Sequence, residues 1–169
     1  MGTEGASVHR IMDRLKTVLV VEDSPHDAGV LQYAAEKAPA GLAFHFVPSG
    51  EEAIAYLEGA GDFANRQAHP LPDLVLLGLS LPGMSGVEVL SWVRHHPLLG
   101  ELKVFVWADA GEQEVIERAT QAGANRFVPK SVAFVRGGPV GLMKGISQAL
   151  NGEAAAGISS ATRQLSSHL

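Results

Sequence analysis

Two adjacent acids and one lysine are the residues of this sequence whose positions could support chemistry. Glu22 and Asp23 directly follow an apolar, β-branched run at 17–21, and Lys130 follows a shorter run at 126–128. Paired carboxylates at a strand end can bind Mg²⁺, which takes one or two carboxylates together with water and phosphate oxygens. A simpler interpretation stays open, because acids also favour helix N-termini, where they complement the dipole.

The stretch at 72–86 must position the centre of any such site. It opens with four apolar residues at 74–77, a pattern typical of a strand buried on both faces. It then becomes rich in glycine, serine and proline, which predicts a loop leading into the next helix. Sites in open α/β sheets form where the strands end at their carboxyl edge. We therefore expect the site to lie near Gly78.

Strand and helix patterns alternate along the rest of the chain. Strands are predicted at 17–21, 42–47, 74–77, 102–107 and 126–128, and helices at 25–37, 50–59, 85–95, 112–121 and 139–150. Five such units with short connections predict a flavodoxin-like, doubly wound α/β fold: a parallel sheet with helices on both faces. The common strand order for such a fold is 2-1-3-4-5. A short helix or a disordered segment is expected at 9–15.

Composition predicts one globular domain at 17–151, an N-terminal extension at 1–16 and a mobile tail at 152–169. The chain has 169 residues, a net charge of −5 and no cysteine, which excludes disulfides and thiolate metal sites. No basic run suggests a nucleic-acid surface, and the apolar runs are far shorter than a membrane span of about 18 residues. Charged residues interrupt 1–16, so no signal peptide is expected, and a cytoplasmic location follows as the default.

Three sequence blocks, in this order, resemble the signature blocks of response-regulator receiver domains, the CheY-like superfamily. They lie at 18–25, 72–86 and 123–130, and the resemblance extends over 16–151. The longer loop that contains 61–63 resembles that of stand-alone receivers associated with bacterial phytochromes. The resemblance implies a part in two-component or phosphorelay signalling, a histidine kinase or another signalling protein as partner, and no enzymatic turnover of its own.

Receivers bind Mg²⁺ and a phosphoryl group at positions that can be matched one by one. Glu22 and Asp23 match the acid pair that binds Mg²⁺, and the backbone carbonyl of Ser80 matches the one that completes the metal site. Gly78 stands at the position of the aspartate that accepts the phosphoryl group. Since glycine has no side chain, it cannot act as the nucleophile, and Mg²⁺ binding should be weak.

The switch positions of receivers show both matches and departures. Phe127 matches the switching aromatic residue and Lys130 the pocket lysine, but Ala108 stands where a threonine or serine binds the phosphoryl oxygens. Ser131 replaces the proline that commonly follows the lysine, often after a cis peptide. Because a cis bond before a residue other than proline costs about 2.5–4 kcal/mol, we predict a trans Lys130–Ser131 bond and some displacement of Lys130.

A phosphorylation-independent receiver that acts by protein–protein binding is therefore the predicted function. Receivers commonly pair through the fourth helix, fifth strand and fifth helix, here residues 112–150, so a homodimer or docking to another signalling protein is expected. Two alternatives stay open. One is a phosphorylatable receiver that uses a substitute acid, Asp23 being the best placed, or whose Gly78 is an engineered substitution. The other is a module that binds a small ligand in the vacated pocket near Lys130, with Trp107 beside it.

Overall fold

The computed structural model describes residues 14–134 and 137–152 and contains a sheet of five parallel strands. The strand order is β2-β1-β3-β4-β5, as predicted, and the flavodoxin-like fold is confirmed. The strands are β1 (Lys16–Val21), β2 (Leu42–Val47), β3 (Leu74–Gly78), β4 (Lys103–Ala108) and β5 (Arg126–Pro129). The short helix predicted at 9–15 and the tail predicted at 152–169 fall almost wholly outside the described residues.

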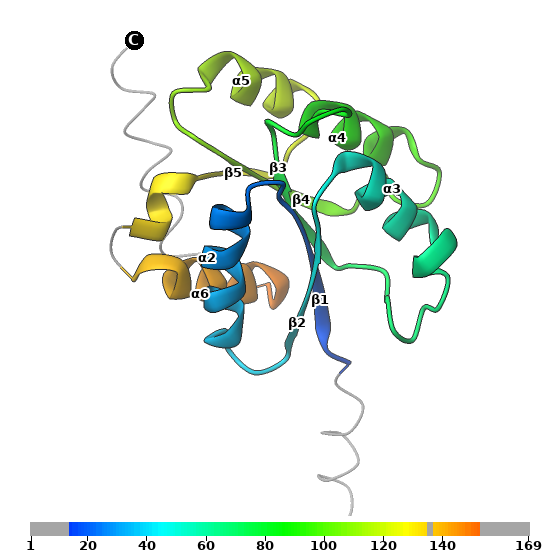
Figure 1. The fold of residues 1–169 in the computed structure, drawn as a ribbon, viewed down its shortest axis with the longest axis horizontal. Coiled ribbons are helices and arrows are strands. Elements are labelled where there is room, and N and C mark those ends of the chain that lie inside the picture. Colours follow the sequence, from blue (N-terminus) through cyan, green and yellow to red (C-terminus); the bar gives the residue numbers. More distant parts are fainter. Residues whose placement is uncertain (1–13, 135–136, 153–169) are drawn as a thin grey trace, which may run out of the picture.

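Helices cover both faces of the sheet (Figure 1). They are α2 (Pro25–Glu36), α3 (Gly50–Glu58), α4 (Gly86–His95), α5 (Gln113–Gln121) and α6 (Gly138–Leu150), with short 3₁₀ turns η1 (Gly61–Phe63) and η2 (Lys130–Phe134). Helices α2 and α6 lie side by side on one face, and α3, α4 and α5 cover the other. Within the described residues, no helix combines the length and apolar character needed to cross a membrane.

Serine residues define the starts of three helices. The hydroxyl groups of Ser24, Ser49 and Ser85 each accept a hydrogen bond from a backbone N–H in the first turn of α2, α3 and α4. These bonds satisfy N–H groups that have no partner inside the helix. Ser85 and Glu88 form a complete capping box, in which the Glu88 side chain accepts the Ser85 N–H. The sequence thus fixes these helix starts to within one residue.

The apolar run of β3 is buried on both faces of the sheet. Leu74 and Leu76 pack in the cluster beneath α2 and α6, whereas Val75 and Leu77 pack in the cluster beneath α3, α4 and α5. Successive side chains of a strand point to opposite faces, so Gly78 belongs to the α2/α6 side. The central strand therefore carries the chain through the core and ends at Gly78.

Candidate functional site

Gly78 ends β3 next to the end of β1. A Cβ atom built on Gly78 would lie 3.0 Å from the Val21 carbonyl oxygen, 3.2 Å from Glu22 Oε2 and 3.4 Å from a Leu81 methyl group. The first two distances are tighter than an ordinary van der Waals contact. A carboxylate from the neighbouring strand end thus borders the space where position 78 would carry a side chain.

Glu22 is a buried acid at the end of β1, with 2% of its side chain exposed. Its Oε1 accepts a hydrogen bond from the Ser24 N–H at 3.1 Å, and its Oε2 lies 3.4 Å from Lys130 Nζ. That oxygen is buried and makes no well-oriented hydrogen bond to any of the described residues. Burial, together with the nearby charge of Asp27, raises the pKa of Glu22 by more than the Ser24 N–H and Lys130 lower it. The Ser24 N–H and Lys130 therefore offset only part of the cost of burying the ionised Glu22 carboxylate.

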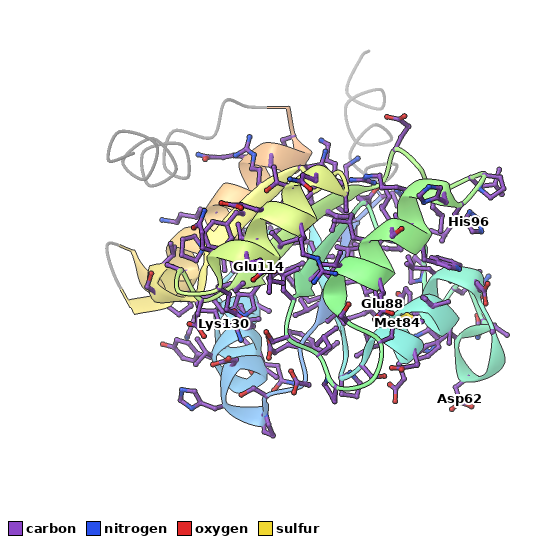
Figure 2. The ribbon with its side chains drawn as sticks, turned by 90° about the horizontal axis from the view of Figure 1, so that it is seen from above. Asp62, Met84, Glu88, His96, Glu114 and Lys130 are labelled. Atoms are coloured by element: carbon purple, nitrogen blue, oxygen red, sulfur yellow. The ribbon has the colours of Figure 1, made fainter. Side chains whose placement is uncertain are left out.

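Lys130 joins β1 and α2 through their acids. Its Nζ lies 2.8 Å from Asp27 Oδ2 in the first turn of α2, in addition to 3.4 Å from Glu22 Oε2. Burial alone would lower the pKa of Lys130, but the hydrogen bond to Asp27 and the charges of Glu22 and Asp27 together raise it. Figure 2 shows Lys130 beside α2, at the end of the molecule opposite His96. We call Glu22, Asp27 and Lys130 the Lys130 cluster.

The sequence pattern does not single out Asp27. It lies three residues after the N-cap Ser24, where an acid is expected for its effect on the helix dipole and its backbone N–H bonds to Ser24 Oγ. A signal is nevertheless present, because the first turn of a helix that follows a strand end lies at the same edge as that end. An acid there is within reach of a lysine on another strand end.

The metal donors expected at this edge do not gather into one site. Asp23 is exposed, and Glu22 is paired with Lys130. In the described part of the chain, no three His, Asp or Glu side chains are placed to hold a metal ion together. Mg²⁺ prefers near-octahedral oxygen coordination. The residues present therefore do not fit a tightly held Mg²⁺.

The predicted switch residues lie on the α3/α4/α5 side of the sheet. Ala108 is the last residue of β4, not the first residue after it, and its methyl group is buried in the core. Phe127 is partly buried and packs against the same core, paired in register with Val106. No cis peptide occurs among the described residues, so the predicted trans bond between Lys130 and Ser131 is confirmed.

Trp107 faces the opposite side and is 2% exposed, packed beneath α2 and α6. It pairs in register with Gly78, and among the described residues its buried Nε1 has no hydrogen-bond partner. This burial indicates that Trp107 packs in the core of the sheet. Its ring lies on the same face of the sheet as the missing side chain of Gly78.

Comparison with known proteins identifies the family. Residues 18–136 match the model of the response regulator receiver domain, and the chain belongs to this family. It is 28% identical to the response regulator Rcp1 of Synechocystis sp. over 116 residues, which cover 69% of this chain and 77% of Rcp1. The chain spans about half of the length of further curated relatives, between 48% and 56%.

Two solved structures have closely similar folds. The phosphorylated cyanobacterial phytochrome response regulator RcpA superposes with a TM-score of 0.69 at 29% identity, over 80% of this chain and 94% of RcpA. The Mn²⁺-bound form of Rcp1 superposes with a TM-score of 0.66 at 26% identity, over 79% and 92% of the two chains. Receiver domains are signalling modules that bind Mg²⁺ or Mn²⁺ and interact with kinases or other signalling proteins. The resemblance to phytochrome response regulators is likewise confirmed.

Proposed function

We propose that this chain is a receiver that does not accept a phosphoryl group and transmits its signal by binding another protein. The observation that carries the proposal is the environment of Gly78. The position of the nucleophile has no side chain, and Glu22 Oε2 lies 3.2 Å from where a Cβ would stand. Lys130, which matches the pocket lysine of receivers, is paired with Glu22 and Asp27.

The acids near Gly78 are poor substitutes for the missing nucleophile. Glu22 is buried and paired, so its carboxylate has little access to a phosphoryl donor. Asp23 is exposed but lies two residues beyond the end of β1 rather than at the end of β3. Ala108 offers no hydroxyl to a phosphoryl oxygen. A transfer to any of these acids would therefore lack both an in-line position and the group that stabilises the product.

A small ligand in the vacated pocket is not favoured either. The space beside Gly78 is bordered by the Val21 carbonyl, the Glu22 carboxylate and the Leu81 side chain, all within 3.4 Å of the Cβ position. Two of these three atoms are oxygens that would repel an anion, and Lys130 already has two carboxylates within 3.4 Å. An anionic metabolite would have to displace Glu22 from the lysine.

Labelling with a phosphodonor tests the proposal. We expect no covalent phosphoryl adduct by intact-mass analysis after incubation with acetyl phosphate and Mg²⁺, and no stoichiometric binding of beryllofluoride. An intact receiver incubated in parallel controls for the donor, and Gly78→Asp reports whether the missing side chain alone is the cause. Stoichiometric labelling of the unaltered chain would overturn the proposal. If that label disappeared in Asp23→Asn, the substitute-acid alternative would hold instead.

The same proposal includes a binding face made of α5, β5 and α6, residues 112–150. Helix α5 buries Ile116 and Ala119 and exposes Glu114, Glu117 and Arg118, which have charges of both signs; Figure 2 shows Glu114 on this helix. A two-fold contact pairs such a surface with itself, so an acid of one copy can meet an arginine of the other. Equilibrium sedimentation should give a dimer that dissociates in Arg118→Glu.

A kinase partner is tested on the same surface. The chain's similarity to phytochrome response regulators makes a phytochrome histidine kinase the first partner to try. Binding should persist without a phosphodonor, because the proposed state needs no phosphorylation. Binding that appears only when the kinase transfers a phosphoryl group to this chain would contradict the proposal.

A further inference from the structure

One carboxylate joins the loop after β3 to the loop after β4. Glu112 Oε1 accepts a hydrogen bond from the Ser80 hydroxyl, and Glu112 Oε2 accepts one from the Asp109 backbone N–H at 3.0 Å. Ser80 lies in the loop at 79–85 and Asp109 directly follows β4. The Ser80–Glu112 contact spans 32 positions of sequence. Glu112 therefore links the loop that follows β3 to the loop that follows β4, at the carboxyl edge of the sheet.

The loop after β3 is a stiff partner for this link. The Met84 N–H donates to Glu51 Oε1 on α3 at 2.9 Å, and the Gly86 N–H donates to the Leu79 carbonyl at 3.0 Å. A Cβ on Gly86 would lie 2.2 Å from the Gly78 carbonyl oxygen, so the loop returns to within backbone contact of its own start. Fastened at both ends, the loop offers a fixed position for the Ser80 hydroxyl.

The other end of the link is the start of α5. Glu112 is the residue before the first turn of α5, and its carbonyl accepts the Ile116 N–H at 3.0 Å. Its side chain makes no capping bond to the helix, unlike the serines that precede α2, α3 and α4. The carboxylate is thus used entirely for the two loop contacts. Any movement of α5 relative to the loop after β3 must break one of them.

We propose that Glu112 is an internal anionic bridge that holds the loop after β4 and the start of α5 in one position relative to the loop after β3. This inference deepens the proposed function and rests on it, because the bridge is formed by the chain's own carboxylate and needs no phosphoryl group. Helix α5 is part of the proposed binding face at 112–150. The bridge therefore holds the α5 end of that face in one position.

Amide exchange measured by NMR on the full chain tests the bridge. In Glu112→Met the side chain has no oxygen to accept a hydrogen bond, and the Asp109 N–H should exchange about five- to tenfold faster, the effect of losing one hydrogen bond of ordinary net strength. Ser80→Ala removes only the contact between the Ser80 hydroxyl and Glu112, so the exchange rate at Asp109 should increase less. Because the two residues share one bridge, the double variant should exchange no faster than Glu112→Met alone.

A matched control is available on the opposite side of the same loop. Glu51→Met removes the carboxylate contact to the Met84 N–H and leaves the Glu112 contacts in place, so exchange at Asp109 should stay unchanged while exchange at Met84 increases. An unchanged Asp109 exchange rate in Glu112→Met, or an equal increase in Glu51→Met, would overturn the bridge. This failure is distinct from that of the proposed function, which would appear as phosphoryl labelling of the unaltered chain whether or not Asp109 is protected.

Discussion

The two ends of the sheet hold their buried charges in different ways. At the amino ends of β4 and β5, Arg94 donates hydrogen bonds at 2.7–3.1 Å to four uncharged oxygens, those of Gly100, Leu102, Gly123 and the Asn125 side chain. At the carboxyl ends, Lys130 lies close to two carboxylates, and one buried oxygen of Glu22 makes no hydrogen bond to the residues that the structure describes.

The difference indicates a structural role for Arg94 and a functional origin for the Lys130 cluster. Arg94 ties the end of α4 to two strand starts, and its planar group places several donors toward backbone carbonyls that would otherwise be unsatisfied. The Lys130 cluster satisfies its charges incompletely, although a buried carboxylate is costly without full hydrogen bonding. A cluster that had only to stabilise the fold would not need a buried acid. We infer that the carboxyl edge retains the charges of a receiver site whose nucleophile is absent.

The largest effect is expected from Arg94→Met. This change leaves the carbonyl groups of Gly100, Leu102 and Gly123 without a partner while keeping the volume of the side chain. We expect the free energy of unfolding, measured by urea denaturation, to fall by about 3 kcal/mol. As a control, Arg14→Met removes an exposed ion pair with Asp73 and should cost less than about 1 kcal/mol. Equal losses in the two variants would contradict the structural role of Arg94.

Lys130→Met should have an intermediate effect, because it leaves the Glu22 and Asp27 carboxylates close together without a cation. At pH 7 we expect a loss of about 2 kcal/mol, less than for a fully buried pair since the Lys130 side chain is 20% exposed. The pKa of Lys130 is raised above its usual value of 10.5, so its contribution is fully present at pH 7 and is lost only above pH 10.5.

Acid pH and a second lysine sharpen the test of Lys130. As the pH falls and the Glu22 carboxylate binds a proton, the difference between Lys130→Met and the unaltered chain should shrink. Lys144→Met on α6, where the side chain is exposed, should change the unfolding free energy by less than about 0.5 kcal/mol at any pH. If the loss of unfolding free energy in Lys130→Met did not depend on pH, it would arise from the packing of the Lys130 methylene groups and not from the lysine charge.

Most of the fold could be predicted from the sequence, because the local sequence signals and the burial pattern favour the same strands and helices. The apolar run at 74–77 required burial on both faces, and Ser24, Ser49 and Ser85 marked helix starts through their hydroxyl groups. The 3₁₀ turn η2 was not predicted, because five residues have no periodicity that distinguishes a turn from a loop. Strand ends shifted by one residue, which placed Ala108 inside β4.

The sequence predicted where the site lies but not which of its side chains contact one another. Topology alone brings the ends of β1, β3 and β5 to one edge, so Glu22, Gly78 and Lys130 were expected to lie near one another. Which acid would meet Lys130 depends on side-chain directions, and Asp27 on α2 was not foreseen. The contact between Ser80 and Glu112 joins two loops that have no sequence periodicity. The position of Asp27 leaves only a weak signal, an acid in the first helical turn after a strand end, and the Ser80–Glu112 contact leaves none in a single sequence.

The smallest change in the free energy of unfolding is expected from Glu22→Gln. Its sign is informative, because the variant should be more stable than the unaltered chain. Because burial raises the pKa of Glu22 above 4.5, its ionisation lowers the stability of the folded chain progressively as the pH rises through and above that value. Glutamine resembles the protonated acid and can still accept the Ser24 N–H. The variant should match the unaltered chain near pH 4 and become the more stable of the two as the pH rises to 7.

The same substitution in the Lys130→Met chain tests whether the two residues act together. There Glu22 has lost its cation, so Glu22→Gln should recover most of the loss caused by Lys130→Met, whereas in the unaltered chain the gain is small. Urea denaturation of the four chains at pH 4 and pH 7 gives this coupling directly. If Glu22→Gln destabilised the unaltered chain by more than about 1 kcal/mol at pH 7, the pair would be a net stabilising ion pair. The Lys130 cluster and Arg94 would then differ only in the geometry of their contacts. The charges at the carboxyl edge would no longer indicate a functional origin.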